Sequence, residues 1–446
     1  MTQTTGSPSL TYERHPPVKV DIFYTMITLS SSMIWSILGS WLLYFYLPPE
    51  GAALVPATLY GVVIFVIRAI NAAIAPGVGH LSDRSHSRWG RRLPFMFVSA
   101  LPMLVFFVLL WTPPVATESA WNLVYLALIL MLYNVSYSFN QIPHTALLPE
   151  IAVTDRHRVR ISAWSASFFL GGVALSSLAG PLIDKWGYTT TALICAGVAL
   201  PFFYLPFLVL REQPGRQIAP KEQLSFRQSL AVMSRNRPFL IMTATGACYW
   251  GVSALIQATI PFVVTEVCLL TTTDTIYFYA PALLASLLCY PPITWLSNRL
   301  GKWSVFAGSL LASAIVLPGL VLIGDWLPVS LKTQGIIWIT LQSIALSGIT
   351  MLPPAFGAEI TDHDESLTGQ RREGAYYAVW GLLDQVANGL TAALLPLLLL
   401  LGRSHSDPRG PLGVRMVGIV GGILMFAAFL IFLNYPLKRP LPTRGD

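Results

Sequence analysis

Long apolar runs, separated by short polar segments, make up most of the chain. Each run reaches the length of about 20 residues that a helix needs to cross a bilayer. The pattern predicts twelve membrane-spanning helices in two sets of six. The runs lie at residues 22–47, 52–79, 93–112, 120–143, 160–183 and 188–210, and then at 238–265, 275–298, 303–324, 333–357, 374–401 and 411–435.

A polar segment at residues 211–237 separates the two groups of six runs and predicts two domains. It contains six Lys and Arg residues, and it predicts a cytoplasmic linker with a short amphipathic helix near 224–233. The first 18 residues are polar, so we expect no cleavable signal peptide. The expected organisation is a cytoplasmic tail at 1–21, a six-helix bundle at 22–210, the linker, a second bundle at 238–435 and a cytoplasmic tail at 436–446.

Composition restricts the fold class further. Hydrophobic residues make up 54% of the chain and charged residues 11%, whereas a soluble domain contains about 25% charged residues. A water-soluble fold of 446 residues could not hide this much apolar surface, so we expect an all-α integral membrane protein. The four cysteines lie in apolar runs without paired spacing, which favours buried thiols over disulfides or a metal site.

The distribution of positive charge predicts the orientation. If both termini are cytoplasmic, the cytoplasmic segments hold 22 Lys and Arg residues and the external segments hold 5. Arg68 is the one that remains, within a predicted span. This imbalance follows the positive-inside rule and predicts cytoplasmic termini in the cell's inner (plasma) membrane. It also accounts for the net charge of +7 without a nucleic-acid partner.

The two sets of helices repeat one another in sequence. Pro76 lies five residues before Leu-Ser-Asp-Arg, and Pro291 lies five residues before Leu-Ser-Asn-Arg, each at the end of the second helix of its set. Pro-Glu-Ile at 149–151 similarly corresponds to Ala-Glu-Ile at 358–360. Two parallel six-helix repeats around a central cavity are an arrangement typical of membrane transporters.

Three segments at the cytoplasmic ends of the helices are similar to those of a known family. Residues 71–94, NAAIAPGVGHLSDRSHSRWGRRLP, resemble the loop between helices 2 and 3 of the glycoside–pentoside–hexuronide symporters. This family is the melibiose-permease branch of the major facilitator superfamily. Residues 140–151 are similar to its helix-4 signature, and residues 359–374 resemble its loop between helices 10 and 11. The resemblance implies a major facilitator fold of two six-helix bundles, working as a monomer.

Charged residues of these segments are candidates for a gate that forms in one conformation and opens in the other. Asp83 lies where it can bridge arginines and helix ends, and Glu373 begins the eleventh span. The alternatives are a fixed topological anchor and a solvated loop whose ion pairs each contribute about 0–1 kcal/mol. The candidate gating residues are Asp83, Arg84, Arg88, Arg91, Arg92, Glu150, Glu359, Asp362, Arg371, Arg372 and Glu373.

Polar and aromatic residues within the spans are candidates for substrate binding. Gln141 and His144 share one helix face, and polar side chains inside a span need ligand, water or a partner helix. The resemblance places Gln141 where the family often carries a sugar-binding aspartate. It also places Ser32 and Ser165 where the family has an acidic residue and an arginine. Trp35, Trp164, Trp250 and Trp380 are candidate cavity aromatics, which stack on a sugar ring or contact an amphipathic substrate.

The coupling-ion site of the family is altered in this chain. Arg68, Asn71 and Ala75 share one face of the second span, and two cation-binding aspartates of the family correspond to Asn71 and Ala75. Gln385 corresponds to a family lysine, and Asp384 lies beside it. We therefore expect the sodium site to be lost. Arg68 and Asp384 are predicted to form a charge pair that binds a proton or an ionic ligand group, with a structural ion pair as the alternative.

These features predict a twelve-helix transporter that carries a small organic solute by alternating access. The resemblance implies a sugar or glycoside, and proton-coupled or uncoupled transport is favoured over sodium symport. An amphipathic, lysophospholipid-like substrate is one alternative, and a non-transporting sensor or assembly factor is another. No nucleophile–base pair, phosphate loop or metal-ligand spacing stands out, so neither an enzyme activity nor a cofactor is expected.

Overall fold

The computed structural model describes residues 18–85, 87, 89–151, 155–210, 233, 236–368, 373–402 and 411–436. Within these ranges the secondary structure is helical, apart from an isolated bridge between Ser87 and Gly90. Most of the linker lies outside the described residues, and with it most of the amphipathic helix predicted near 224–233.

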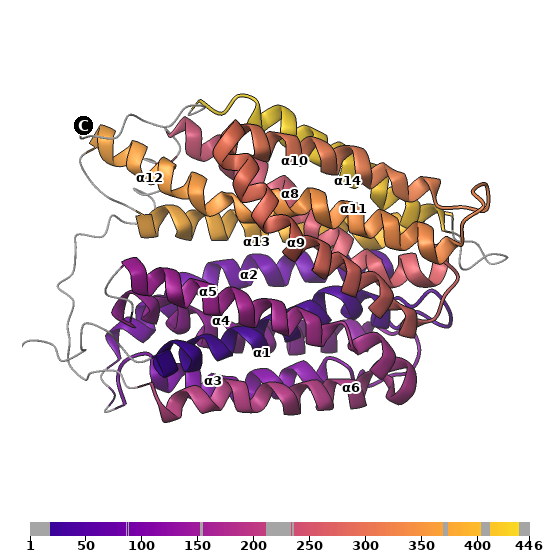
Figure 1. Cartoon of the computed structure of the whole chain (residues 1–446). Helices are drawn as coiled ribbons and strands as arrows, with labels where there is room; N and C mark the ends of the chain where they lie inside the picture. The colour runs from indigo at the N-terminus through magenta and orange to yellow at the C-terminus, as the bar shows by residue number, and fades with distance from the viewer. Residues whose placement is uncertain are drawn as a thin grey trace, which may run out of the picture.

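The helices fall into an N-terminal and a C-terminal group that lie against each other (Figure 1). The N-terminal half contains α1 (Val18–Tyr46), α2 (Ala57–Arg84), α3 (Leu93–Leu109), α4 (Ala120–Ile151), α5 (Asp155–Ser176), α6 (Ala179–Tyr204) and η1 (Leu205–Leu208). The C-terminal half contains α8 (Arg237–Phe262), η2 (Val263–Val267), η3 (Thr272–Thr275), α9 (Ile276–Leu300), α10 (Lys302–Val316), η4 (Leu317–Leu322), α11 (Leu331–Met351), α12 (Pro353–Thr368), α13 (Glu373–Leu399) and α14 (Leu412–Phe432).

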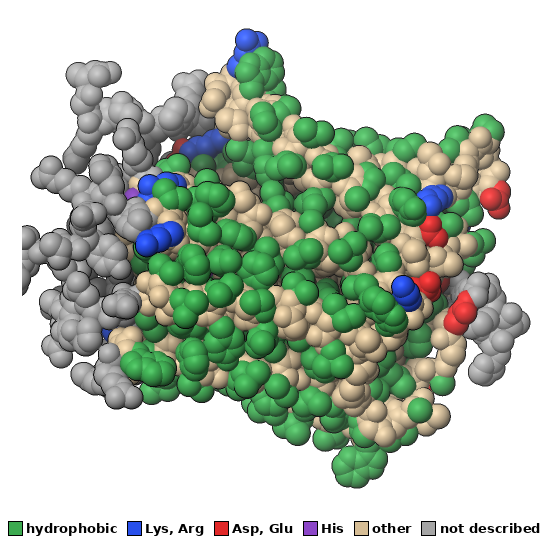
Figure 2. All heavy atoms as spheres, turned by 60° about the horizontal axis from the view of Figure 1, so that its bottom comes forward, with side chains coloured by type: hydrophobic (Ala, Val, Ile, Leu, Met, Phe, Trp, Pro, Cys, Tyr) green, Lys and Arg blue, Asp and Glu red, His purple; other side chains and the backbone are tan. Residues whose placement is uncertain are grey.

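The observed helices match the predicted spans position by position. Eleven segments are long and apolar enough to cross a membrane, and the apolar α3 is shorter, at 17 residues. Together they lie at the twelve predicted positions. Figure 2 shows apolar side chains over the middle of one face and charged side chains near its two ends. The chain is therefore a multi-pass membrane protein, while the count of twelve crossings and the side of the termini remain predictions.

Two helix boundaries depend on individual residues. Gly187 has φ of 77° and ψ of 172°, a conformation that favours glycine, and it turns the chain between the fifth and sixth spans inside α6. The span predicted at 333–357 lies within the apolar segment Leu331–Ser366, but its helix is interrupted. It divides at Leu352 because Pro353 and Pro354 lack the backbone N–H that would continue α11.

Helix packing repeats between the halves. In the N-terminal half α1 packs on α5 and α6, and α3 packs on α4 and α6. The equivalent helices of the C-terminal half make the same pairs: α8 packs on α13 and α14, and α10 packs on α11 and α14. The main contacts between halves are α1 with α8, α2 with α13, α6 with η3 and α5 with α9. This pairing confirms the internal repeat, because equivalent helices take equivalent positions.

Glycines allow the halves to meet closely at the end of the bundle that holds the C-terminus of α1. We call this end external, following the predicted orientation. A Cβ atom at Gly61 of α2 would lie 2.7 Å from the Cα atom of Ala393 in α13. A Cβ at Gly180 would lie 2.1 Å from Oγ1 of Thr275, and one at Gly39 would lie 2.9 Å from the Gln257 side chain. A larger residue at Gly61 or Gly180 would meet backbone atoms of the other half and push the halves apart, whereas at Gly39 the Gln257 side chain would have to move.

Hydrogen bonds also join the halves at this end, and we call these bonds and the glycine contacts the external seal. The Thr273 hydroxyl donates to Oδ2 of Asp184 at 2.9 Å, and the Tyr279 hydroxyl donates to Oγ of Ser40 at 2.9 Å. The Tyr44 hydroxyl donates to Oγ1 of Thr265 at 3.3 Å. Each bond joins the N-terminal half to the C-terminal half, so the external ends of the two halves are held together in this structure.

We predict that Gly61→Leu opens the external seal. The added side chain overlaps the α13 backbone, and overpacking of this kind costs about 1–3 kcal/mol. A Ser253→Cys probe in a cysteine-free background, placed on the cavity wall described below, should then react several-fold faster with a membrane-impermeant thiol reagent added outside. The control is Gly197→Leu, whose Cβ meets no atom within 4 Å. Equal labelling in a stable Gly61→Leu protein would contradict the prediction.

Candidate functional site: a cavity between the two halves

A cavity of about 420 Å³ lies between the halves. Helices α1, α2 and α4 line it from the N-terminal half, and α8 and α13 line it from the C-terminal half. Its lining includes five of the predicted binding residues, Trp35, Arg68, Asn71, Asp384 and Gln385, and also the candidate aromatic Trp250. The volume is in the range of pockets that hold small organic ligands.

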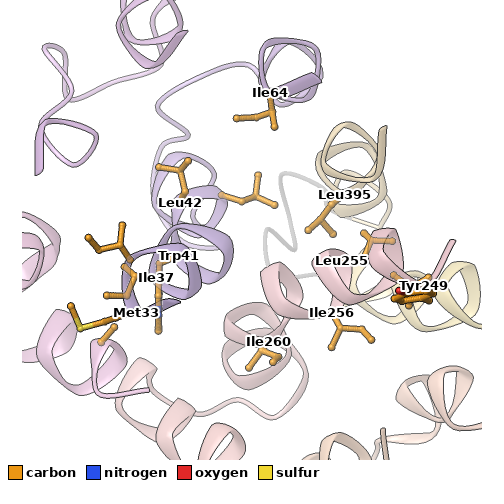
Figure 3. Close-up of a cluster of buried hydrophobic side chains, with 14 of the residues drawn as sticks. Met33, Ile37, Trp41, Leu42, Ile64, Tyr249, Leu255, Ile256, Ile260 and Leu395 are labelled. Carbon is orange, nitrogen blue, oxygen red and sulfur yellow. The ribbon is translucent and has the colours of Figure 1, made fainter. Parts of the chain in front are cut away.

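Apolar side chains close the external end of the cavity. Leu42 of α1 and Ile64 of α2 face Leu255 of α8 and Leu395 of α13 (Figure 3). All four are buried, and we call them the roof. Trp35, one to two helical turns from Leu42 and closer to the middle of the bundle, is 41% exposed. The cavity is therefore shut by apolar packing at one end and accessible at the level of Trp35.

The side chain of Arg68 joins α2 of the N-terminal half to α13 of the C-terminal half, at the middle of the membrane-spanning region. Its Nη1 atom donates a hydrogen bond to Oε1 of Gln385 at 3.1 Å. Gly389, one turn further along α13, makes room for it, because a Cβ there would lie 3.2 Å from the Cβ of Arg68. The predicted charge pair of Arg68 with Asp384 is not observed, since the guanidinium bonds to the neighbouring amide instead.

Asp384 lies on the α13 wall of the cavity, where it faces α8. A Cβ at Gly246 of α8 would lie 3.8 Å from Oδ1 of Asp384 and 3.1 Å from Nε1 of Trp380. Oδ1 of Asp384 is buried and has no hydrogen-bond partner in the described part of the chain. A buried carboxylate that lacks a cation is unfavourable, so this side chain is suited to carrying a proton.

The side-chain oxygen of Asn71 already has a hydrogen-bond partner within the protein. Its Oδ1 atom accepts a hydrogen bond from the Ser138 hydroxyl at 2.9 Å, which links α2 to α4. Ala75, the other position of the family's cation site, has no side-chain oxygen to offer. Within the described ranges, no cluster of three His, Cys, Asp or Glu residues could hold a metal ion.

Comparison with known proteins identifies the family. Residues 23–439 match the family described as MFS/sugar transport protein, where MFS is the major facilitator superfamily. The chain belongs to this family. It is therefore a membrane transporter with the major facilitator fold, and not an enzyme.

Similar proteins agree with this assignment. The isoprimeverose transporter of Lactiplantibacillus pentosus is 26% identical over 412 residues, covering 89% of this chain and 83% of the relative. The glucuronide carrier protein homolog of Escherichia coli is 25% identical over 431 residues, covering 93% of this chain and 91% of the relative. These relatives do not favour the lipid-carrier and non-transporting alternatives.

Solved structures confirm the fold. The nucleoside transporter NupG is 14% identical, with a TM-score of 0.65 over 93% of this chain and 99% of that one. A bacterial homolog of the human lysosomal transporter Spinster, solved in an inward-facing and unoccupied conformation, is 11% identical with a TM-score of 0.65. It covers 95% of this chain and 98% of its own.

Six of the predicted binding residues of the transporter lie outside the cavity lining: Ser32, Gln141, His144, Trp164, Ser165 and Trp380. Ser32 packs instead between helices, and its hydroxyl donates to the carbonyl oxygen of Phe169 at 3.0 Å. Gly172 of α5 approaches it so closely that a Cβ would lie 2.0 Å from Oγ of Ser32. Its role in this conformation is to hold α1 against α5.

Gln141 and His144 connect α4 to α1. The Gln141 amide donates to Oγ of Ser31, and the His144 ring stacks on Tyr24 with 4.4 Å between ring centroids. The Tyr24 hydroxyl also donates to the carbonyl oxygen of His144 at 2.9 Å. These bonds satisfy the polar groups that suggested ligand contacts, so substrate binding by these residues stays a prediction.

Two of the gating candidates, Arg92 and Glu359, have described bonds within their own halves. Arg92 is buried and donates to the carbonyl oxygen of Ala146 in α4. Glu359 of α12 forms a salt bridge of 2.6 Å with Lys302 of α10. Asp362 and Arg91 also have partners. The side chains of Asp83, Arg84, Arg88, Glu150, Arg371, Arg372 and Glu373 lie outside the described residues.

Sequence reasoning missed a buried charge cluster at the cytoplasmic end of α1. Asp21 is fully buried, and its carboxylate contacts Nε of Arg160 at 2.5 Å and Nε2 of His157 at 2.6 Å, both from α5. The signal was present, because an acidic residue begins the first apolar run and a basic cluster begins the fifth. The basic residues were interpreted only as a determinant of orientation.

We predict that Asp21→Asn lowers the free energy of unfolding by about 3 kcal/mol, the lower end of the cost of breaking a buried ion pair. Arg160 is 37% exposed, so water compensates part of the loss. The measurement is thermal unfolding of the purified protein in detergent. Asp325→Asn removes an exposed carboxylate and serves as the control, with an expected change within about 0.5 kcal/mol. Equal effects of the two substitutions would contradict the assignment.

Proposed function

We propose that the chain carries a sugar or glycoside across the inner membrane by alternating access. The observation that carries this proposal is the cavity, because both halves contribute its lining and the roof closes it at one end. A site shared by two halves opens to one side or the other when the halves rock. The named substrates of the relatives, isoprimeverose and a glucuronide, support a sugar as the solute.

The cavity lining suits a sugar in its polar and aromatic composition. Trp35 and Trp250 come from opposite halves and offer ring faces for stacking on a pyranose. Asn134, Gln385 and Asn388 offer amide groups that both donate to and accept from hydroxyls. One chain supplies both halves of this site, so we propose a monomer as the functional unit.

The structure supports an assignment of the inward-facing conformation. The glycine contacts, the roof and the described hydrogen bonds between the halves all lie at the middle or the external end. The described bonds of Arg92 and Glu359, at the opposite end, stay within one half. In the outward-facing state we expect the cytoplasmic gating residues to join the halves and the external contacts to separate.

Coupling in this proposal uses a proton on Asp384. The carboxyl group lies on the cavity wall with one oxygen unpaired, so a proton taken up outside can be released inside when the cavity changes sides. Asn71 and Ala75 offer no carboxylate for sodium. The proton and the sugar therefore enter together, and sodium has no part in the cycle.

We predict that purified protein in proteoliposomes accumulates its sugar when the outside is more acidic than the inside, and that added sodium has no effect. Asp384→Asn should abolish accumulation driven by the proton gradient, because the amide cannot carry the proton. It should retain at least about half of the exchange of labelled for unlabelled sugar, which needs no net proton movement. The exchange assay is thus the internal control for folding and substrate binding.

Two results would contradict this assignment. Sodium-dependent uptake would show that Asn71 still serves a cation site. Gradient-driven accumulation by Asp384→Asn would move the coupling site elsewhere in the transporter.

A further inference from the structure

Among the described residues, no carboxylate forms an ion pair with Arg68. Arg68 is the only Lys or Arg in the cavity lining, and no described carboxylate lies within 4 Å of its nitrogen atoms. A guanidinium has five N–H donors, and the described hydrogen bond to Gln385 uses one of them. Holding such a charge inside a membrane costs about 2.5–3.5 kcal/mol on insertion scales, so a compensating anion is favoured there.

Three tyrosines gather around this cation. Tyr60 of α2 and Tyr133 and Tyr137 of α4 line the same cavity as Arg68. The rings of Tyr133 and Tyr137 stack one helical turn apart, with 6.1 Å between centroids. The structure describes no hydrogen bond from any of the three hydroxyls. We call Arg68, Tyr60, Tyr133 and Tyr137 the donor cluster.

We propose that the transported sugar carries an acidic group and that the donor cluster receives it. The guanidinium and the phenol hydroxyls can all donate hydrogen bonds, and a carboxylate, phosphate or sulfate oxygen only accepts them. The guanidinium at the centre of the cluster cannot accept a hydrogen bond, whereas the amides of Gln385 and Asn388 on the α13 wall can both donate to and accept from a neutral hydroxyl. This inference rests on the proposed function and adds the chemical class of its substrate.

Asp384 on the opposite wall fits the same ligand. An ionised carboxylate there would repel an acidic sugar, whereas a protonated one would not. Uptake of one proton with one singly charged sugar acid moves no net charge, so transport of that pair is independent of membrane potential. A neutral sugar taken up with a proton would instead carry one positive charge inward.

The test compares matched neutral and acidic sugars on the full-length protein in lipid nanodiscs. Calorimetry measures the binding of glucose, glucuronate, glucose 6-phosphate and glucose 6-sulfate, and the galactose series repeats the comparison with the other sugar configuration. We expect at least one acidic sugar to bind tenfold or more tightly than its neutral parent. Which of the three acids binds identifies the group as carboxylate, phosphate or sulfate.

Variants of the donor cluster show how much of the preference for an acidic sugar comes from the charge of Arg68 and how much from the arrangement of its hydrogen-bond donors. Arg68→Gln should reduce the preference for the acidic sugar to about one, and Arg68→Lys should keep part of it, because the charge remains without the planar fork. Tyr137→Phe removes one hydroxyl donor and should weaken binding of the acidic sugar several-fold more than binding of its neutral parent. Arg299→Gln, an exposed arginine at the end of α9, is the control.

The outcomes distinguish this inference from the proposed function. Equal binding of neutral and acidic sugars by the unmodified protein, or a preference that survives Arg68→Gln, overturns the acidic substrate and leaves sugar transport standing. Absence of binding by every sugar, acidic and neutral, overturns both. If Arg68→Gln does not fold, two measurements still test the acidic substrate. They are the preference of the unmodified protein for the acidic sugar and the reduction of that preference in Tyr137→Phe.

Discussion

Arg68 brings a positive charge to the middle of a membrane protein, where little water is available to solvate it. Among the described residues, the guanidinium has one hydrogen-bond partner, the neutral amide of Gln385. Arg68 also lines the cavity between the two halves. Since the bond joins α2 to α13, the two halves are held together at the same level at which the ligand would bind. Whatever neutralises Arg68 also acts on this bond, so binding and the relative position of the halves are linked through one side chain.

The external seal uses a different kind of contact, which explains how the same surfaces can part. Gly61 and Gly180 bring backbones and small side chains together, and at Gly39 the end of the Gln257 side chain lies against α1. Few described hydrogen bonds cross this surface, and the roof adds only apolar contact. Separation would therefore break few strong interactions, and a modest difference in ligand affinity between the two states could drive it. A transporter needs this balance, because a seal with many strong contacts would cost more free energy to open than ligand binding supplies.

Much of the fold could be predicted because membrane crossing imposes a length and an apolar composition on each helix. The repeat was visible for a similar reason, since Pro76 and Pro291 mark equivalent helix ends. The division at Leu352 was missed, because apolar composition continues across Pro353 although the helix does not. Within the site, Trp35 faces the cavity while Ser32, almost one turn away, packs against α5. The sequence pattern could not tell which of the two faces the cavity, because α1 carries apolar and small residues on all sides. Its orientation about its own axis depends on packing against α5, α6 and α8.

Charged residues were harder to interpret than apolar ones because one charge can serve several purposes. The basic residues at the start of α5 predict the orientation by their sign, yet His157 and Arg160 also contact the buried Asp21 and join α1 to α5. Glu359 and Lys302 likewise join α12 to α10 in the other half. Each half thus has described ion pairs of its own near the end that is predicted to be cytoplasmic. If the halves rock as units, the access of the cavity changes without breaking these pairs, and only the contacts between the halves need to exchange.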